Sequence, residues 1–173
     1  MSKRVLVAII AFAALIALVM IARGTGDPLP NGAVADRIVV DKSDRVLTLM
    51  NGDRALKTYH VTFGRQPVGK KVRQGDDRTP EGRYAIDYRN VNSQYHLALH
   101  VSYPNAEDVR RARAGGYAPG GDVMIHGMRK GFGWIGGLHR AVNWTHGCIA
   151  VTDSEVDEIG RAVRDGTPIE IRP

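Results

Sequence analysis

Two hydrophobic patterns divide the chain. Residues 5–22 (VLVAIIAFAALIALVMIA) are apolar without a break, whereas most later apolar residues alternate with polar ones. Alternation with a period of two is typical of β-strands that have one buried face. It predicts strands over residues 37–40, 46–50, 56–63, 84–88, 95–101, 122–126 and 169–171. The pair Asn51-Gly52 predicts a tight turn after the second of these strands.

One late segment has a helical pattern. Its apolar residues recur three or four positions apart: Val156, Ile159, Ala162 and Val163. Glu155 follows Thr152 by three positions, which is the capping-box arrangement that marks a helix start. We therefore predict a helix over residues 153–164, with one further helical turn near residues 106–112. The chain from residue 37 onward is predicted to be a single, mainly β domain.

The apolar run is long enough to cross a membrane. As a helix it spans roughly 27 Å, close to the thickness of a bilayer core. Lys3 and Arg4 precede it, which favours a cytoplasmic N-terminus. A cleavable signal peptide is the alternative, but its apolar region is usually shorter, about 7–15 residues. We predict residues 1–23 to be an N-terminal membrane anchor or a signal, with an uncleaved anchor favoured. Residues 24–36 are predicted to be a linker. Residues 37–173 would then lie on the periplasmic side of the inner membrane.

The size and distribution of the net charge argue against a nucleic-acid partner. The chain carries +6, and half of this comes from Lys3, Arg4 and Arg23, which flank the apolar run. The modest remainder is scattered, whereas nucleic-acid binding usually shows a basic stripe interleaved with aromatic residues. We therefore expect no nucleic-acid partner. The oligomeric state is left open by the sequence.

The single cysteine, Cys148, excludes an intramolecular disulfide scaffold and a Cys-based zinc finger. A lone cysteine is most often a small buried apolar residue. An unpaired thiol outside the cytoplasm favours a second explanation, because His126 ends a predicted strand and could serve as its base. The backbone N–H groups of Gly147 and Cys148 would stabilise the resulting oxyanion. His146 is an alternative base, although residues so close in a loop rarely point at each other.

These residues also form a recognisable pattern. Ile125-His126-Gly127, a Gly-rich loop and Thr145-His146-Gly147-Cys148 resemble the signature of the L,D-transpeptidase catalytic domain, also called the YkuD domain. Residues 75–82 (GDDRTPEG) resemble a second element of that family. The resemblance extends over residues 37–171. It implies a mainly β fold, a mixed sheet or β-sandwich with one or two packed helices.

The resemblance also implies roles for individual residues. Cys148 would be the nucleophile, His126 the base, and Gly127 the residue whose carbonyl orients the imidazole. The oxyanion and the substrate would contact Thr145, His146, Gly147 and Trp134. The substrate would be a peptidoglycan stem peptide, cleaved after its third residue with release of D-alanine. The acyl group would pass to an amine of a neighbouring stem, and no cofactor or metal is implied.

Two departures from the family pattern leave the acceptor open. Ala150 stands where the family often has Arg or Asn, and the gap between His126 and Thr145 is slightly long. A cysteine hydrolase of stem peptides or of lipoprotein–wall links is therefore the alternative. A zinc peptidase built on His96 and His100, which would share one face of a strand, lacks the HExxH spacing. A wall-binding module without activity is the last candidate.

Two loops carry further candidate residues. Trp134 and Trp144 lie between the histidine and the cysteine, where they would either wall the substrate or anchor the loop to the core. The basic residues of the loop 64–83 would either meet stem carboxylates or lie in solvent: Lys70, Lys71, Arg73, Arg78 and Arg83. We also expect the start of the late helix to lower the pKa of Cys148 if the two lie close together.

Overall fold

The computed structural model describes residues 5–7, 9, 10, 12 and 27–173. The predicted anchor, residues 1–23, and the first part of the linker therefore lie largely outside the described residues. The described positions between 5 and 12 are helical. Within the described ranges, no helix combines the length and apolar character needed to cross a membrane.

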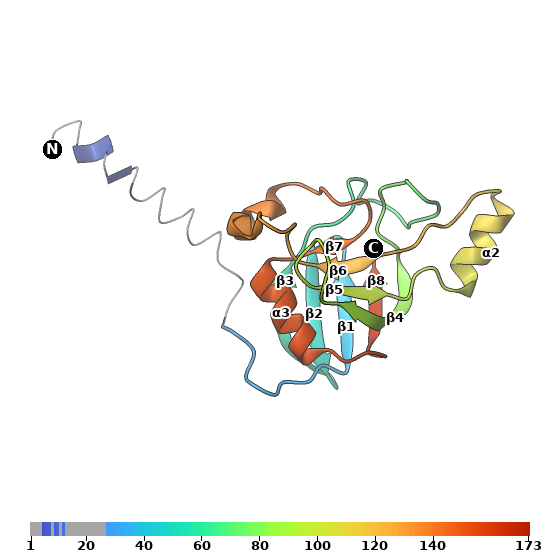
Figure 1. Cartoon of the computed structure of the whole chain (residues 1–173), viewed down its shortest axis with the longest axis horizontal. Coiled ribbons are helices and arrows are strands. Elements are labelled where there is room, and N and C mark those ends of the chain that lie inside the picture. Colours follow the sequence, from blue (N-terminus) through green and yellow to red (C-terminus); the bar gives the residue numbers. More distant parts are fainter. Residues whose placement is uncertain (1–4, 8, 11, 13–26) are drawn as a thin grey trace.

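The described domain is built on one mixed sheet of eight strands (Figure 1). Their order across the sheet is β3-β2-β1-β8-β4-β5-β6-β7. The bounds are β1 Arg37–Asp41, β2 Val46–Asn51, β3 Arg54–His60, β4 Gly82–Asn90, β5 Ala98–Val101, β6 Met124–His126, β7 Ile149–Ala150 and β8 Pro168–Arg172. The mainly β prediction is confirmed.

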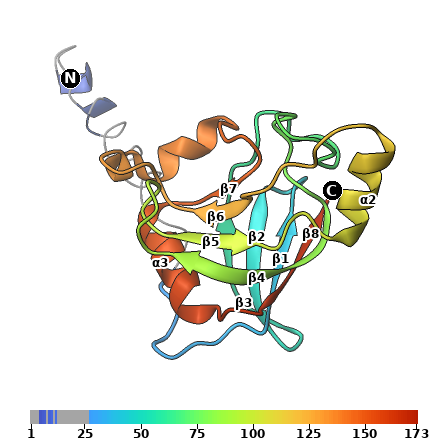
Figure 2. The ribbon, with the colours of Figure 1, turned by 45° about the vertical axis from the view of Figure 1, so that its right-hand side comes forward.

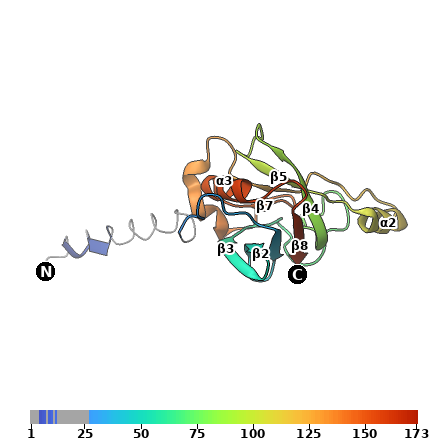
Figure 3. The ribbon, with the colours of Figure 1, turned by 90° about the horizontal axis from the view of Figure 1, so that it is seen from below.

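The last strand of the chain joins the two halves of the sheet. β8 pairs in parallel with β1, where Ile38 faces Ile169, and antiparallel with β4, where Tyr84 faces Ile169. The sheet curls about this junction, so that the β1–β2–β3 half and the β4–β7 half form two layers (Figure 3). Alternate residues of the first half point into the space between the layers. Ile38 and Leu47, for example, are fully buried, as the period-two pattern predicts.

Helix α3 (Asp153–Ala162) closes one end of this core and confirms the helix expected there. The Thr152 hydroxyl accepts the Glu155 N–H, while the Glu155 carboxylate accepts the Thr152 N–H. Val156 and Ile159 are fully buried. Burial of each contributes about 1.5–3 kcal/mol.

The second helix, α2 (Ala106–Ala114), is longer than the single turn expected from the sequence. Asn105 caps it by accepting the N–H groups of Glu107 and Asp108. The helix lies at the far edge of the domain from α3 (Figure 2).

Several strand boundaries differ from the prediction. The segment predicted to pair over 95–101 is a strand only from Ala98, because His96 has a left-handed backbone (φ 62°) that a ladder does not accept. The predicted strand 56–63 ends at His60, and Thr62 makes an isolated bridge with Ala150. The short strand β7 was not predicted. The Gly-rich loop contains a 3₁₀ segment, η1 (Gly133–Ala141).

Candidate active site

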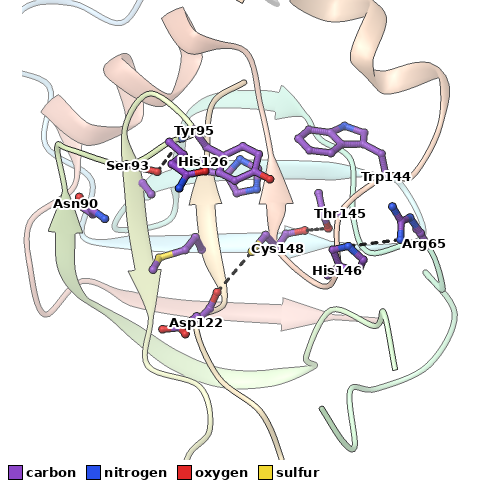
Figure 4. A pocket seen from close by; sticks show the side chains of 13 residues that line it. Arg65, Asn90, Ser93, Tyr95, Asp122, His126, Trp144, Thr145, His146 and Cys148 are labelled. Carbon is purple, nitrogen blue, oxygen red and sulfur yellow. Dashed lines mark hydrogen bonds between the residues drawn. The ribbon is translucent and has the colours of Figure 1, made fainter. Parts of the chain in front are cut away.

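Two adjacent strands bring the histidine and the cysteine together. His126 is the last residue of β6, and Cys148 comes directly before β7. The two strands pair in parallel, with His126 opposite Ala150. Both side chains line one pocket of about 530 Å³ (Figure 4), together with Arg65, Asn90, Ser93, Gln94, Tyr95, Ala98, Asp122, Met124, Trp144, Thr145 and His146.

His126 is a buried imidazole held in one orientation. Its Nδ1 lies 2.6 Å from the carbonyl oxygen of Gly127. Because a carbonyl only accepts, Nδ1 carries the proton and Nε2 is the basic nitrogen. Tyr95 and Trp144 flank the ring, with centroids 4.6 Å and 5.7 Å away. Burial lowers the pKa of His126, and the hydrogen bond to Gly127 opposes this without cancelling it. The imidazole is therefore neutral at pH 7.

The thiol of Cys148 is also neutral at rest. Its Sγ lies 3.6 Å from the carbonyl oxygen of Asp122, to which it donates (Figure 4). Burial raises the pKa of this thiol, and the Asp122 carboxylate acts in the same direction. The N–H of Met124 and the ammonium of Lys71 act in the opposite direction without cancelling the rise. A neutral thiol and a neutral imidazole therefore share the pocket.

The expected help from the late helix is not found. Strand β7 separates Cys148 from Thr152, the N-cap of α3. The stabilisation that a helix N-terminus gives an anion fades within its first turn. The pKa of Cys148 is accordingly raised rather than lowered.

The turn that carries the cysteine is held by Thr145. Its hydroxyl donates to the carbonyl oxygen of Cys148 at 2.7 Å and accepts the N–H of Gly147 at 3.1 Å. The Gly147 N–H, which we expected to stabilise the oxyanion, is thus engaged by Thr145 within the turn. Gly147 has φ +126°, and a Cβ there would lie 2.6 Å from the carbonyl oxygen of Arg78. Only glycine fits at this position without movement of the neighbouring backbone.

His146 lies at the rim of the pocket. Its side chain is 73% exposed, and its Nδ1 lies 2.7 Å from Asp77 Oδ1. Arg65 Nη1 approaches its Nε2 at 3.5 Å. The contacts of His146 therefore tie it to the loop 64–81, and His126 is the histidine that geometry favours as base.

The loop 64–81 packs against the cysteine turn instead of extending into solvent. Gly64 bridges Thr145, and its N–H donates to Thr79. Asp76 accepts the backbone N–H groups of Val72, Arg73 and Arg78 as well as the Lys71 ammonium. Burial raises the pKa of the Asp76 carboxyl, but these donors outweigh it and lower the pKa overall. The expectation of a solvated loop is therefore wrong for Lys71, which is only 4% exposed.

The two tryptophans have different environments. Trp144 lines the pocket, and its Nε1 donates to His139 Nδ1 at 3.5 Å. Trp134, which we expected to contact the substrate, lies in η1, is 76% exposed and is not among the residues that line the pocket. Sequence reasoning missed Tyr95 and Arg65, which come from segments far from the Cys–His motif, and Asp122, which lies shortly before His126 in the chain. No local signal marked them.

The two histidines considered for a zinc site contact different carboxylates. His96 Nε2 contacts Asp157 at 2.9 Å, whereas His100 Nδ1 contacts Asp87 at 2.6 Å. His96 also precedes β5, so the two do not share a strand face as expected. In the part of the chain that the structure describes, no group of three or more His, Cys, Asp or Glu side chains is placed to hold a metal ion.

Known proteins match this chain over most of its length. The family model of YkuD, the L,D-transpeptidase catalytic domain, matches residues 35–171. The Escherichia coli K12 protein named "Putative L,D-transpeptidase YafK" is 33% identical over 106 residues, which cover 60% of this chain and 35% of YafK. This chain therefore aligns with only about a third of that curated relative.

Solved structures show the same fold. Pgp2 from Campylobacter jejuni, described as a helical cell shape determining protein, has a TM-score of 0.60 at 23% identity, over 89% of this chain and 53% of Pgp2. The L,D-transpeptidase from Xylanimonas cellulosilytica (residues 123-326) has a TM-score of 0.53 at 15% identity, over 84% of this chain and 64% of that one. At these identities the likeness establishes the fold alone.

Proposed function

The chain belongs to the family of YkuD-type L,D-transpeptidase catalytic domains, and on that premise we propose that it is a peptidoglycan L,D-transpeptidase with Cys148 as nucleophile. The observation that carries the proposal is the shared pocket. It contains the chain's only thiol and a buried neutral imidazole whose Nδ1 is held by Gly127.

In the first half-reaction, Cys148 Sγ attacks the carbonyl carbon of the third residue of a stem peptide. His126 Nε2 takes the thiol proton as the C–S bond forms. The tetrahedral intermediate then collapses, the C–N bond breaks, and His126 returns the proton to the departing amine of D-alanine. A thioester on Cys148 remains.

In the second half-reaction, the side-chain amine of another stem attacks the thioester. His126 accepts a proton from the amine and passes it to the sulfur as the C–S bond breaks. This restores the thiol and the neutral imidazole and leaves a cross-link between two stems. Since both groups rest in their neutral forms, charge appears on them only during the reaction.

The oxyanion of each intermediate needs backbone donors. Because Thr145 accepts the Gly147 N–H, we assign this role to the N–H groups of His146 and Cys148, which lie on either side of Gly147. Thr145 then has a structural part in the site, since its hydroxyl holds the turn that presents these donors.

The pocket walls suggest how the stem peptide lies. Tyr95 and Trp144 form an aromatic wall next to His126, suited to the aliphatic part of a diamino acid. Arg65 lies at the rim with a side chain that is 54% exposed. Its guanidinium is placed to receive a carboxylate of the stem peptide.

The substrate is consistent with the predicted location. Peptidoglycan lies outside the cytoplasmic membrane, and the apolar residues 5–22 would tether the domain to the inner membrane on that side.

A cysteine hydrolase is the second candidate, and one observation favours it. Ala150 is fully buried in β7, so the position where the family often carries Arg or Asn offers no side chain to hold an acceptor. Water would then resolve the same thioester. The two candidates differ in the acceptor and share the nucleophile and the base.

Product analysis separates the candidates. The full chain, purified in detergent, is incubated with a disaccharide-tetrapeptide beside a Cys148→Ala control, and products are identified by mass spectrometry. Cross-linked dimers that lack one D-alanine support the transpeptidase. Monomers that lack D-alanine, without dimers, support the hydrolase. Unchanged substrate, both here and with cross-linked or lipoprotein-linked wall fragments, contradicts both.

A further inference from the structure

Lys71 is a buried cation that the proposed reaction does not use. Its Nζ donates to Asp76 Oδ1 at 2.8 Å and to the carbonyl oxygen of Arg73 at 3.1 Å. The side chain is 4% exposed. Lysine is rarely buried to this extent, because removing an ammonium from water is costly even when it is paired.

The ammonium lies against the cysteine turn. The position that a Cβ of Gly147 would occupy is 3.9 Å from Lys71 Nζ and 2.6 Å from the carbonyl oxygen of Arg78. No atom of Asp76 is nearer to that point than Lys71 Nζ. The positive end of the ion pair therefore faces Gly147, the residue directly before Cys148.

Charged and titratable groups surround Cys148 on several sides. Asp122 approaches from the segment before β6, and His126 shares the pocket from the end of β6. His146, Arg65 and Asp77 form a linked group at the rim. Lys71 approaches from the loop 64–81, and its charge lowers the pKa of the thiol against the effects of burial and Asp122.

We propose that Lys71 is a positioning residue of this site, held behind Gly147 by Asp76 so that its charge favours the negative charge that forms on Cys148. This inference rests on the proposed use of Cys148 as nucleophile. A unit positive charge behind the residue next to a partly desolvated thiol, at an effective dielectric constant of about 20, changes the thiolate population severalfold.

Lys42 offers a matched control. It is 6% exposed, and its Nζ also donates to one carbonyl oxygen, of Gly69 at 2.8 Å, and one carboxylate, of Glu81 at 2.5 Å. It is not among the charges that act on Cys148. Removing Lys42 therefore breaks a comparable buried ion pair without removing the Lys71 charge beside Gly147.

The test is the pH dependence of thiol alkylation in the full chain. Because the chain has a single cysteine, the mass gained from iodoacetamide reports on Cys148 alone. For Lys71→Met we expect alkylation at pH 7 to be roughly five- to tenfold slower, with the profile moved to higher pH and an unchanged rate at its alkaline plateau. We expect Lys71→Arg to restore most of the wild-type profile and Lys42→Met to leave it unchanged.

Other results would overturn the proposal. One is a wild-type profile in folded Lys71→Met; another is an equal displacement in Lys42→Met, which would indicate general loosening. If Lys71→Met does not fold, as judged by circular dichroism, Lys71→Gln takes its place, since Gln can still donate to Asp76 without a charge. Alkylation needs no peptide substrate, so a failure of the transpeptidase proposal is detected separately, by product analysis.

Discussion

The Nδ1–H of His126 donates to the carbonyl oxygen of Gly127, the next residue in the chain, over 2.6 Å. This bond decides which nitrogen of the ring is basic. It does so without a carboxylate, so the imidazole gains no negative partner that would raise its pKa strongly. Burial instead lowers the pKa of His126, which keeps the ring available as a base at neutral pH.

Replacing the thiol tests the nucleophile directly. We expect Cys148→Ala to abolish product formation while the domain stays folded, because the side chain is only half-buried and small. Mass spectrometry of muropeptide products and thermal unfolding by circular dichroism measure the two effects. Turnover by a folded Cys148→Ala variant would exclude the proposed mechanism.

The acid limb of the pH–rate profile reports on His126. Acylation needs the neutral imidazole, which persists below pH 6.5 because the folded pKa is lowered from that value. We therefore expect kcat/KM for stem-peptide cleavage to hold as pH falls through 6.5 and to decline only at lower pH. A decline centred above pH 6.5 would contradict the buried, neutral base.

The buried imidazole of His139 makes the free energy of unfolding depend on pH. Burial lowers its pKa from 6.5 to about 4, so the unfolded chain takes up its proton first as pH falls. Its contribution to stability is complete above pH 6.5 and is lost as pH falls towards 4. We expect the free energy of unfolding to drop by about 2 kcal/mol between pH 7 and pH 5 from this residue alone.

Urea unfolding at the two pH values measures this drop. In His139→Phe the drop should shrink to the part that His126 contributes in the same direction. Asp76 and Glu158, whose pKa values are also lowered, lose their contributions at lower pH and change little above pH 5. If the free energy of unfolding of His139→Phe falls as much as that of the wild type between pH 7 and pH 5, another group causes the effect.

Gly147→Ala tests the contact between the loop 64–81 and the cysteine turn. The new Cβ would lie 2.6 Å from the carbonyl oxygen of Arg78 at φ +126°, so the backbone must move. Since a displacement of about 1 Å can cost about a hundredfold in rate, we expect kcat/KM to fall by about that factor. Gly166→Ala is the matched control, because Gly166 has φ +91° and no neighbouring atom lies within 4 Å of the position that a Cβ would take. It should lose about 1 kcal/mol of stability and keep its activity.

Arg65 tests the orientation of the stem peptide. We expect Arg65→Gln to raise KM roughly five- to tenfold while kcat changes less, because the guanidinium would bind a substrate carboxylate. Arg65→Lys should restore part of the affinity. The rate of Cys148 alkylation should stay the same in both variants, and an equal fall in alkylation and turnover would show that Arg65 acts on the thiol instead.

Local sequence patterns predicted those elements whose hydrogen bonds or buried faces depend on residues close together in the chain. The capping box of Thr152 and Glu155 predicts the start of α3 because its hydrogen bonds span three residues. The alternation at β1 and β2 predicts their buried faces for a similar reason. Alternation misled at residues 95–97, where the chain turns and His96 has a positive φ.

The sequence by itself determined the mainly β class, the late helix and the Cys148–His126 pair, since each depends on a short motif or a regular period. Tertiary structure alone decided the surroundings of that pair. Lys71 is buried beside Gly147, the Gly147 N–H is engaged by Thr145, and Tyr95 packs on His126. The contacts of Lys71 and Tyr95 join segments distant in the chain, and the packing around the turn sets the pKa values of its thiol and imidazole. Desolvation depends on which groups surround a side chain in space, and no pattern along the chain records that.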